Sequence, residues 1–211
     1  MTQILRLGST APDFQAQTTQ GPIHFHDFIK SSWTILFSHP SDFTPVCTTE
    51  LGEVAKRLKD FQNLSTKVIG LSCNELNDHH RWVEDINRVN SCEVTFPIIA
   101  DPTREIATLY QMLDEQDLTN QDSKGIPFTV RSVFIIDPKK SIRLILQYPA
   151  STGRQFDEIL RCLKSLQLSD QFSITTPANW IPGEKVIVHP SISDQEAEKK
   201  FTNGIDYKLL I

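Results

Sequence analysis

The chain has 211 residues, a formal net charge of -5 and a pI of about 5.7. Hydrophobic residues make up 39% of it and charged residues 22%, the balance of a soluble globular protein with a buried core. The acidic balance argues against a nucleic-acid partner, and no apolar run approaches the ~18–20 residues that a membrane span needs.

Strand and helix patterns alternate along most of the chain. Short apolar runs predict three strands, at residues 33–38, 67–72 and 96–100. Apolar residues at helical spacing predict a helix after each strand, at residues 45–61, 78–89 and 104–112. A polar stretch at residues 114–125 predicts a surface loop. A hairpin is predicted at residues 129–148 and a closing helix at residues 153–166. This order predicts an α/β fold, a thioredoxin-like sandwich with a central mixed sheet flanked by helices.

Composition changes after about residue 168. Prolines punctuate the remaining segment, which holds one short strand candidate at residues 185–188 and one short helix candidate at residues 193–201. A tail of this size is too small to be stable alone. We therefore expect a thioredoxin-like domain at residues 1–168 and a small C-terminal module at residues 169–211 that packs on the main domain or on a partner subunit.

Four cysteines stand at positions 47, 73, 92 and 162. Their spacing excludes both zinc-type pairs and a Cys-x-x-Cys redox motif, so no metal and no cofactor is expected. The first eight residues are too short and too mixed for a signal peptide, which makes the cytoplasm the expected location. In a reducing compartment the default interpretation is four free thiols, and the question is whether one is placed to react.

Cys47 stands where a helix is predicted to begin. Thr44 followed by Pro45 is a helix-start signal, with threonine as the N-cap and proline in the first helical position. Cys47 then lies in the first turn, where free N–H groups and the helix dipole favour a thiolate. This effect contributes only about 0.5–1 kcal/mol, too little to ionise most of a thiol at neutral pH. A nearby cation must supply the rest, and spacing alone does not identify it.

The motif Pro40-x-x-x-Thr44-x-x-Cys47 resembles the active-site motif of the peroxiredoxins, thiol peroxidases with a thioredoxin fold. The longer string SHPSDFTPVCTTEL, residues 38–51, resembles their single-cysteine branch, the peroxiredoxin-6 subfamily. The resemblance continues through YPASTGR at residues 148–154 and TPANW at residues 176–180. It therefore extends over nearly the whole chain, including the tail.

The resemblance implies a role for each matching residue. Cys47 corresponds to the peroxidatic cysteine, Thr44 to the hydroxyl that bonds sulfur and peroxide, and Pro40 to the residue that shields the pocket. Arg131 corresponds to the arginine that stabilises the thiolate. Supporting positions are Arg154 as a second arginine, Glu50 as a carboxylate that orients the arginines, and His39, for which a structural role is equally plausible.

The resemblance also implies partners. Hydrogen peroxide and organic or lipid hydroperoxides are the expected substrates, in antioxidant defence and redox homeostasis. Cys73 and Cys92 are weak candidates for a resolving thiol, so an external thiol, glutathione or a thioredoxin-type protein, is expected to recycle the sulfenic acid. The family also implies a homodimer with the tail at the subunit interface.

Other functions are weighed against this one. A peroxide sensor would oxidise Cys47 and turn over slowly, and a holdase chaperone would act independently of Cys47. A thioredoxin-type disulfide reductase is disfavoured because Thr44 stands where the first cysteine of its motif would be. Phospholipase activity, which some relatives perform with a Ser-His-Asp set, is not expected. Ser32 and His26 are present, but Ser32 lacks its flanking glycines, and Lys139 stands where the aspartate should be, two residues from Asp137.

Overall fold

The computed structural model describes residues 4–201, and the predictions that fall on residues 1–3 and 202–211 lie outside that range. The chain forms two compact units, residues 1–154 and 155–211. Helix α6 (Phe156–Phe172) belongs to the second unit. The division therefore precedes the helix that was expected to close the first domain, and the boundary predicted at residue 168 falls inside α6.

The first unit is built on a mixed sheet of seven strands in the order β2-β1-β5-β4-β3-β6-β7. The strands are β1 (Gln15–Thr18), β2 (Gly21–His24), β3 (Trp33–Ser38), β4 (Thr66–Ser72), β5 (Ile98–Ala100), β6 (Arg131–Ile136) and β7 (Ile142–Tyr148). Strands β3, β4 and β5 are parallel, and β6 and β7 form an antiparallel hairpin beside β3. The predicted mixed sheet is confirmed.

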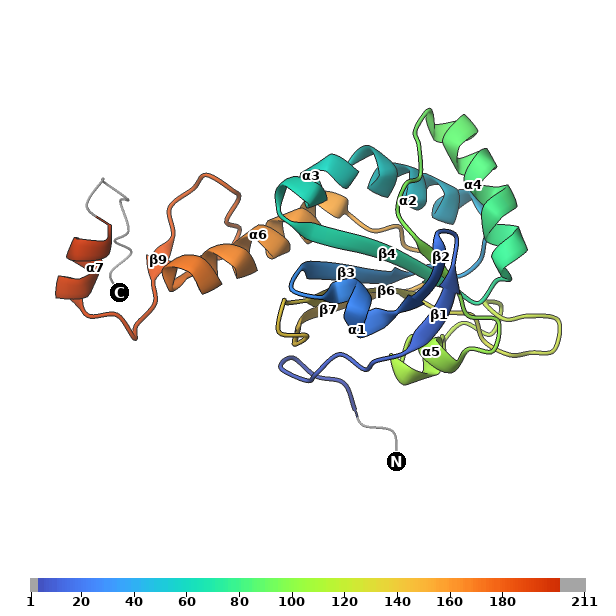
Figure 1. Cartoon of the computed structure of the whole chain (residues 1–211), viewed down its shortest axis with the longest axis horizontal. Helices are drawn as coiled ribbons and strands as arrows, with labels where there is room; N and C mark the ends of the chain where they lie inside the picture. Colours follow the sequence, from blue (N-terminus) through green and yellow to red (C-terminus); the bar gives the residue numbers. More distant parts are fainter. Residues whose placement is uncertain (1–3, 202–211) are drawn as a thin grey trace. The chain divides into compact units, whose positions relative to one another are not determined.

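Helices cover both faces of this sheet. They are α1 (Phe25–Ile29), α2 (Pro45–Lys56), α3 (Leu58–Asn63), α4 (Leu76–Asn90) and α5 (Glu105–Leu109). Figure 1 shows α2, α3 and α4 on one face and α1 and α5 on the other. Every residue of β3 is buried, because a strand covered on both sides has no solvent face. Leu36 packs in the cluster that contains α1 and α5.

The pattern predictions hold best for strongly apolar segments. The strand predicted at residues 33–38 matches β3, and the hairpin predicted at residues 129–148 contains β6 and β7. The single helix predicted at residues 45–61 is wrong, because Arg57 takes a turn conformation that separates α2 from α3. The hairpin β1–β2 was not predicted. Its strands have four residues each and are half exposed, so they carry no clear alternation, and only Gly21 with a φ of 96° marks the turn.

The second unit holds α6, the two-stranded sheet of β8 (Ile174–Thr175) and β9 (Ile187–Val188), and α7 (Asp194–Lys200). Ile174, Ala197 and Phe201 form its small apolar core. Ser193 caps α7 in a reciprocal arrangement with Glu196. None of the helices within residues 4–201 combines the length and apolar character needed to cross a bilayer.

Helices α2 and α4 meet at Gly52, where a methyl group would overlap the side-chain amide of Asn90. That amide donates to the carbonyl oxygens of Thr48 and Ile86, at 3.0 Å each, and so links the two helices. We expect Gly52→Ala to destabilise the protein by about 1–2 kcal/mol, because losing these bonds outweighs the gain in helix propensity. In an Asn90→Ala background, where no side-chain amide is left to overlap, Gly52→Ala should instead stabilise the protein. Urea unfolding of the four proteins checks this sign reversal, and equal effects in both backgrounds would contradict it.

Candidate active site

The first turn of α2 positions Cys47. Strand β3 ends at Ser38, and the chain turns through Phe43, whose φ is 58°, before Thr44 takes the extended N-cap conformation and Pro45 starts the helix. The predicted helix start is confirmed. The Thr44 hydroxyl, however, does not cap the helix, since it donates to the carbonyl oxygen of Ser41 at 2.9 Å. Cys47 is the third helical residue and its side chain is buried.

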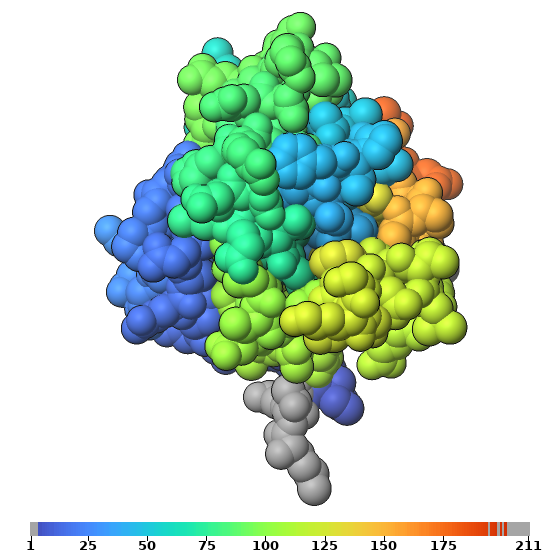
Figure 2. Space-filling model, turned by 90° about the vertical axis from the view of Figure 1, so that its right-hand side faces the viewer, coloured from blue at the N-terminus to red at the C-terminus, as the bar shows by residue number. Residues whose placement is uncertain are grey.

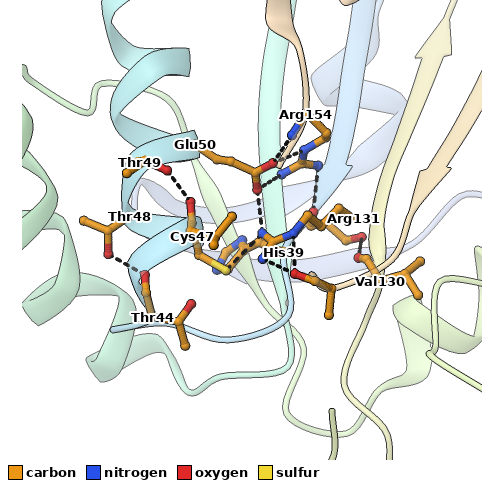
Figure 3. A network of polar contacts seen from close by, with 12 residues as sticks. His39, Thr44, Cys47, Thr48, Thr49, Glu50, Val130, Arg131 and Arg154 are labelled. Atoms are coloured by element: carbon orange, nitrogen blue, oxygen red, sulfur yellow. Dashed lines mark hydrogen bonds and ion pairs between the residues drawn. The ribbon is translucent and has the colours of Figure 1, made fainter. Parts of the chain in front are cut away.

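A guanidinium lies against the Cys47 sulfur. Arg131 opens β6, which pairs with β3, so its side chain starts at the end of the sheet where α2 begins. Its Nη1 lies 3.3 Å from Cys47 Sγ and 2.7 Å from Glu50 Oε2. Its Nε and Nη2 donate to the carbonyl oxygen of Ala150, at 3.0 and 2.6 Å. Figure 3 shows the Arg131 guanidinium in contact with both the Cys47 sulfur and the Glu50 carboxylate. The cation that the helix start requires is therefore Arg131, 84 residues away in sequence.

Glu50 joins two arginines into one buried network. One turn after Cys47, its carboxylate accepts bonds from Arg131 and, at 3.0 and 2.8 Å, from Nε and Nη2 of Arg154. The Arg154 Nη1 donates to the carbonyl oxygens of Ser38 and Ser132. Burial alone would raise the pKa of the Glu50 carboxyl, but the charges and hydrogen bonds of Arg154 and Arg131 hold it below its usual range. A charged Glu50 thus fixes where Arg131 points.

His39 belongs to a second buried network that includes Asp42 and His79. The Asp42 carboxylate lies 2.8 Å from His39 Nε2 and 2.6 Å from His79 Nδ1. Burial would raise the pKa of Asp42, yet the two histidine hydrogen bonds lower it to about 2. Burial lowers the pKa of His39, against the effect of Asp42. His39 therefore stays neutral, with a buried Nδ1 that has no partner among the described residues.

This second network was missed by the sequence analysis for a physical reason. Asp42 lies inside the recognised motif, but His79 lies on an ordinary amphipathic helix, and nothing in its spacing marks it as buried against Asp42. The three donor atoms lie within 4.8 Å of one another, as metal ligands do. Their direct separations of 2.6–2.8 Å are hydrogen bonds, because two ligands each about 2.0–2.1 Å from one metal ion lie farther apart than that.

A hollow of about 510 Å³ opens beside the network, and Pro40, Thr44 and Arg131 contribute to its lining. Cys47 lies behind these residues and is not itself part of the lining. A molecule in the hollow reaches Arg131, whose Nη1 contacts the sulfur. All seven predicted site residues are thus placed. Cys47, Arg131, Glu50 and Arg154 form one network, His39 belongs to the adjacent one, and Pro40 and Thr44 line the hollow.

Two models of known protein families match this sequence. The model of the AhpC/TSA family matches residues 7–145, and that of the C-terminal domain of 1-Cys peroxiredoxin matches residues 165–204. Human peroxiredoxin-6 is 50% identical over 210 residues, which cover 98% of this chain and 92% of that protein. The chain belongs to the peroxiredoxin family.

Solved structures agree with this assignment. A cysteine-to-serine mutant of peroxiredoxin 6 from Arenicola marina is 46% identical, with a TM-score of 0.89 over 94% of this chain and 90% of that one. A yeast mitochondrial 1-Cys peroxiredoxin is also 46% identical, with a TM-score of 0.84 over 94% and 93%. The thioredoxin-like fold of the peroxiredoxins and a thiol peroxidase activity follow from these relationships.

The lipase-type residues of this peroxiredoxin are engaged elsewhere. His26 Nε2 lies 2.8 Å from the carbonyl oxygen of Ala11. Asp137 accepts bonds from the backbone of Lys139 and Ser141 in the β6–β7 turn, and pairs with Arg143. Among the described residues no hydrogen bond joins Ser32, His26 and Asp137. The geometry therefore offers no hydrolytic triad at these positions.

Proposed function

We propose that this peroxiredoxin reduces hydroperoxides through the Cys47 thiolate. Sγ attacks one peroxide oxygen, the O–O bond breaks, and the departing alkoxide or hydroxide takes up a proton to become alcohol or water. The new S–O bond makes Cys47 a sulfenic acid. The observation that carries this proposal is the 3.3 Å contact between Arg131 Nη1 and the sulfur. A cation at this distance favours the anionic, nucleophilic form of the thiol.

The surrounding residues have distinct parts in this proposal. Arg131 and the Thr44 hydroxyl hold the two peroxide oxygens in line with the sulfur, which lowers the entropic cost of reaction. Pro40, which is buried and lines the hollow, shields the sulfur from bulk water. Glu50 and Arg154 are positioning residues, because they act through Arg131. His39, held by Asp42, keeps the turn before α2 in place.

An external thiol returns Cys47 to its reduced state. A resolving cysteine must attack as a thiolate, and the other thiols resist ionisation. Burial, with the charge of Asp101, raises the pKa of Cys73 to about 12. Burial, with the Glu158 hydrogen bond, raises that of Cys162 to about 11, and burial also raises that of Cys92. The yeast relative is described with thiol resolution through glutathione and thioredoxin systems, which makes these the reductants we propose here.

The hollow is large enough for hydrogen peroxide and for organic or lipid hydroperoxides, which we propose as substrates. We further propose a cytoplasmic homodimer active in antioxidant defence. Strand β7 supports the dimer. Beyond Ile142, whose backbone bonds to Gly8 and Ser9, its outer edge has no partner strand in the described part of the chain, and such edges are usually covered. Sedimentation velocity and cell fractionation check these two assignments, and a monomer or an organelle-bound protein would contradict them.

Mass spectrometry of the peroxide-treated protein tests the catalytic proposal. Without glutathione, Cys47 should gain one oxygen atom. With glutathione, it should return to the thiol through a mixed disulfide. A matched Cys73→Ser variant should behave identically, because that buried thiol takes no part. A disulfide between Cys47 and another cysteine of the chain would contradict the external reductant. An oxidised Cys47 that glutathione and thioredoxin both fail to reduce would favour a sensor over a peroxidase.

A further inference from the structure

The walls of the hollow come from three chain segments, residues 40–46, 117–131 and 150–151. Pro45 and Val46 at the start of α2 form an apolar side, and Phe128 faces them from the loop that precedes β6. Asp117 and Thr119 of the same loop also line the hollow. Figure 2 shows this yellow-green loop meeting the blue segment around α2 on the face turned to the viewer. A peroxide in this hollow therefore lies near Arg131, an apolar surface and Asp117.

Only two of the lining side chains carry a charge, Arg131 and Asp117. The Arg131 guanidinium pairs with Glu50 at 2.7 Å, a carboxylate that it shares with Arg154, and is directed at the Cys47 sulfur. Asp117 makes no ion pair with any cation of the described residues. The side-chain and backbone hydrogen bonds of Thr119 lower the pKa of Asp117, so it is ionised at neutral pH. The lining thus carries one negative charge that is not paired with a cation among the described residues.

The position of this carboxylate is well defined. Its Oδ1 accepts from the Thr119 amide at 2.9 Å and from the Thr119 hydroxyl at 2.6 Å. Its own amide donates to Asp114 Oδ1 at 3.0 Å, and Asp114 is buried. Asn120 adds a further bond to the other oxygen of Asp114, at 3.0 Å. Asp117 is therefore held at the hollow by a bonded loop, and does not swing freely on the surface.

We propose that Asp117 determines substrate specificity, by making the peroxidase prefer neutral hydroperoxides to hydroperoxides that carry a carboxylate. The inference rests on the proposed function, since it concerns access to the same sulfur. A neutral alkyl group gains contact with Pro45, Val46 and Phe128 at no electrostatic cost. An anionic substrate in the hollow lies near the charge of Asp117, and like charges close together repel.

The test compares two substrates that differ only in charge, a short tertiary alkyl hydroperoxide ending in a carboxylate and its methyl ester. Stopped-flow kinetics give the second-order rate constant of Cys47 oxidation for each, at low and at high salt. We expect the wild type to favour the ester at low salt. Asp117→Asn keeps an acceptor for Thr119 and should reduce the ester-to-acid ratio by about two- to fivefold, the range typical of exposed charges. High salt should shrink the wild-type preference, because salt screens exposed charges.

Glu115→Gln is the matched control. Glu115 is an exposed acid two residues away in the same loop, and it lines a different hollow. Glu115→Gln changes the net charge by the same amount as Asp117→Asn, and it should leave the ester-to-acid ratio of the rate constants unchanged. An unaltered ratio in Asp117→Asn, or an equal change in both variants, would overturn the inference. If neither peroxide oxidised the wild type, the proposed peroxidase function would fail instead, so the two failures are distinguishable.

Discussion

The Cys47→Ser variant is expected to lose peroxide reduction, with a fall in rate of about three orders of magnitude or more. A serine hydroxyl stays protonated at neutral pH even beside Arg131, so no anionic nucleophile remains at the start of α2. Substituting one buried oxygen for sulfur preserves the helix and the Arg131–Glu50 ion pair at 2.7 Å. Stopped-flow measurement of peroxide consumption, with circular dichroism to confirm folding, makes this a test of chemistry.

The other cysteines provide the controls for that experiment. Cys73→Ser and Cys92→Ser should retain full turnover with an external thiol, since burial disfavours ionisation of both thiols. A holdase activity that persists in Cys47→Ser would be a separate property of the protein. Fast turnover that persists in Cys47→Ser would remove the basis of the mechanism.

Replacement of Arg131 by methionine is expected to slow peroxide reduction by about a hundredfold to a thousandfold, as when one donor is removed from an anion-stabilising site. Methionine fills similar space without charge or donors. Arg131→Lys keeps the charge and should be intermediate, because a lysine cannot bond Glu50, Ala150 and the sulfur through one planar fork. Second-order rate constants for the reaction with hydrogen peroxide should fall from the wild type to Arg131→Lys and then to Arg131→Met.

Arg154→Lys is the matched control within the same network. Arg154 is anchored on Glu50 and on two main-chain carbonyls, so its replacement should cost stability more than chemistry, about 1.5–3 kcal/mol for each bond lost to a charged partner. The free energy of unfolding in urea and the rate constant of peroxide reduction together distinguish the roles of the two arginines. If Arg154→Lys slowed the reaction as much as Arg131→Met and left stability intact, the assigned roles would have to be exchanged.

The sequence predicts the local parts of this site well. Thr44 and Pro45 mark the helix start because their preferences depend on neighbouring residues alone. The magnitude of the dipole effect shows that a cation is needed. It cannot identify Arg131, which reaches the sulfur only through the pairing of β6 with β3. That assignment came from the family resemblance.

Other features depend on tertiary contacts and leave no local signal. His79 looks like any polar residue of an amphipathic helix until Asp42 is packed against it. The break at Arg57 leaves the spacing of apolar residues almost unchanged, so periodicity does not detect it. The carboxylate of Asp117 can affect substrate binding only because its loop and the start of α2 line the same hollow. All of these features depend on contacts between residues that lie far apart in the sequence, and local sequence patterns do not show such contacts.

The central claim is that the guanidinium at position 131 keeps the sulfur at position 47 anionic. Ultraviolet absorbance of the thiolate measures this directly in a protein whose other three cysteines are replaced by serine. At neutral pH that protein should show the absorbance of one thiolate, and adding Arg131→Met should abolish it. Equal thiolate absorbance with and without Arg131, or none in the parent protein, would contradict the claim.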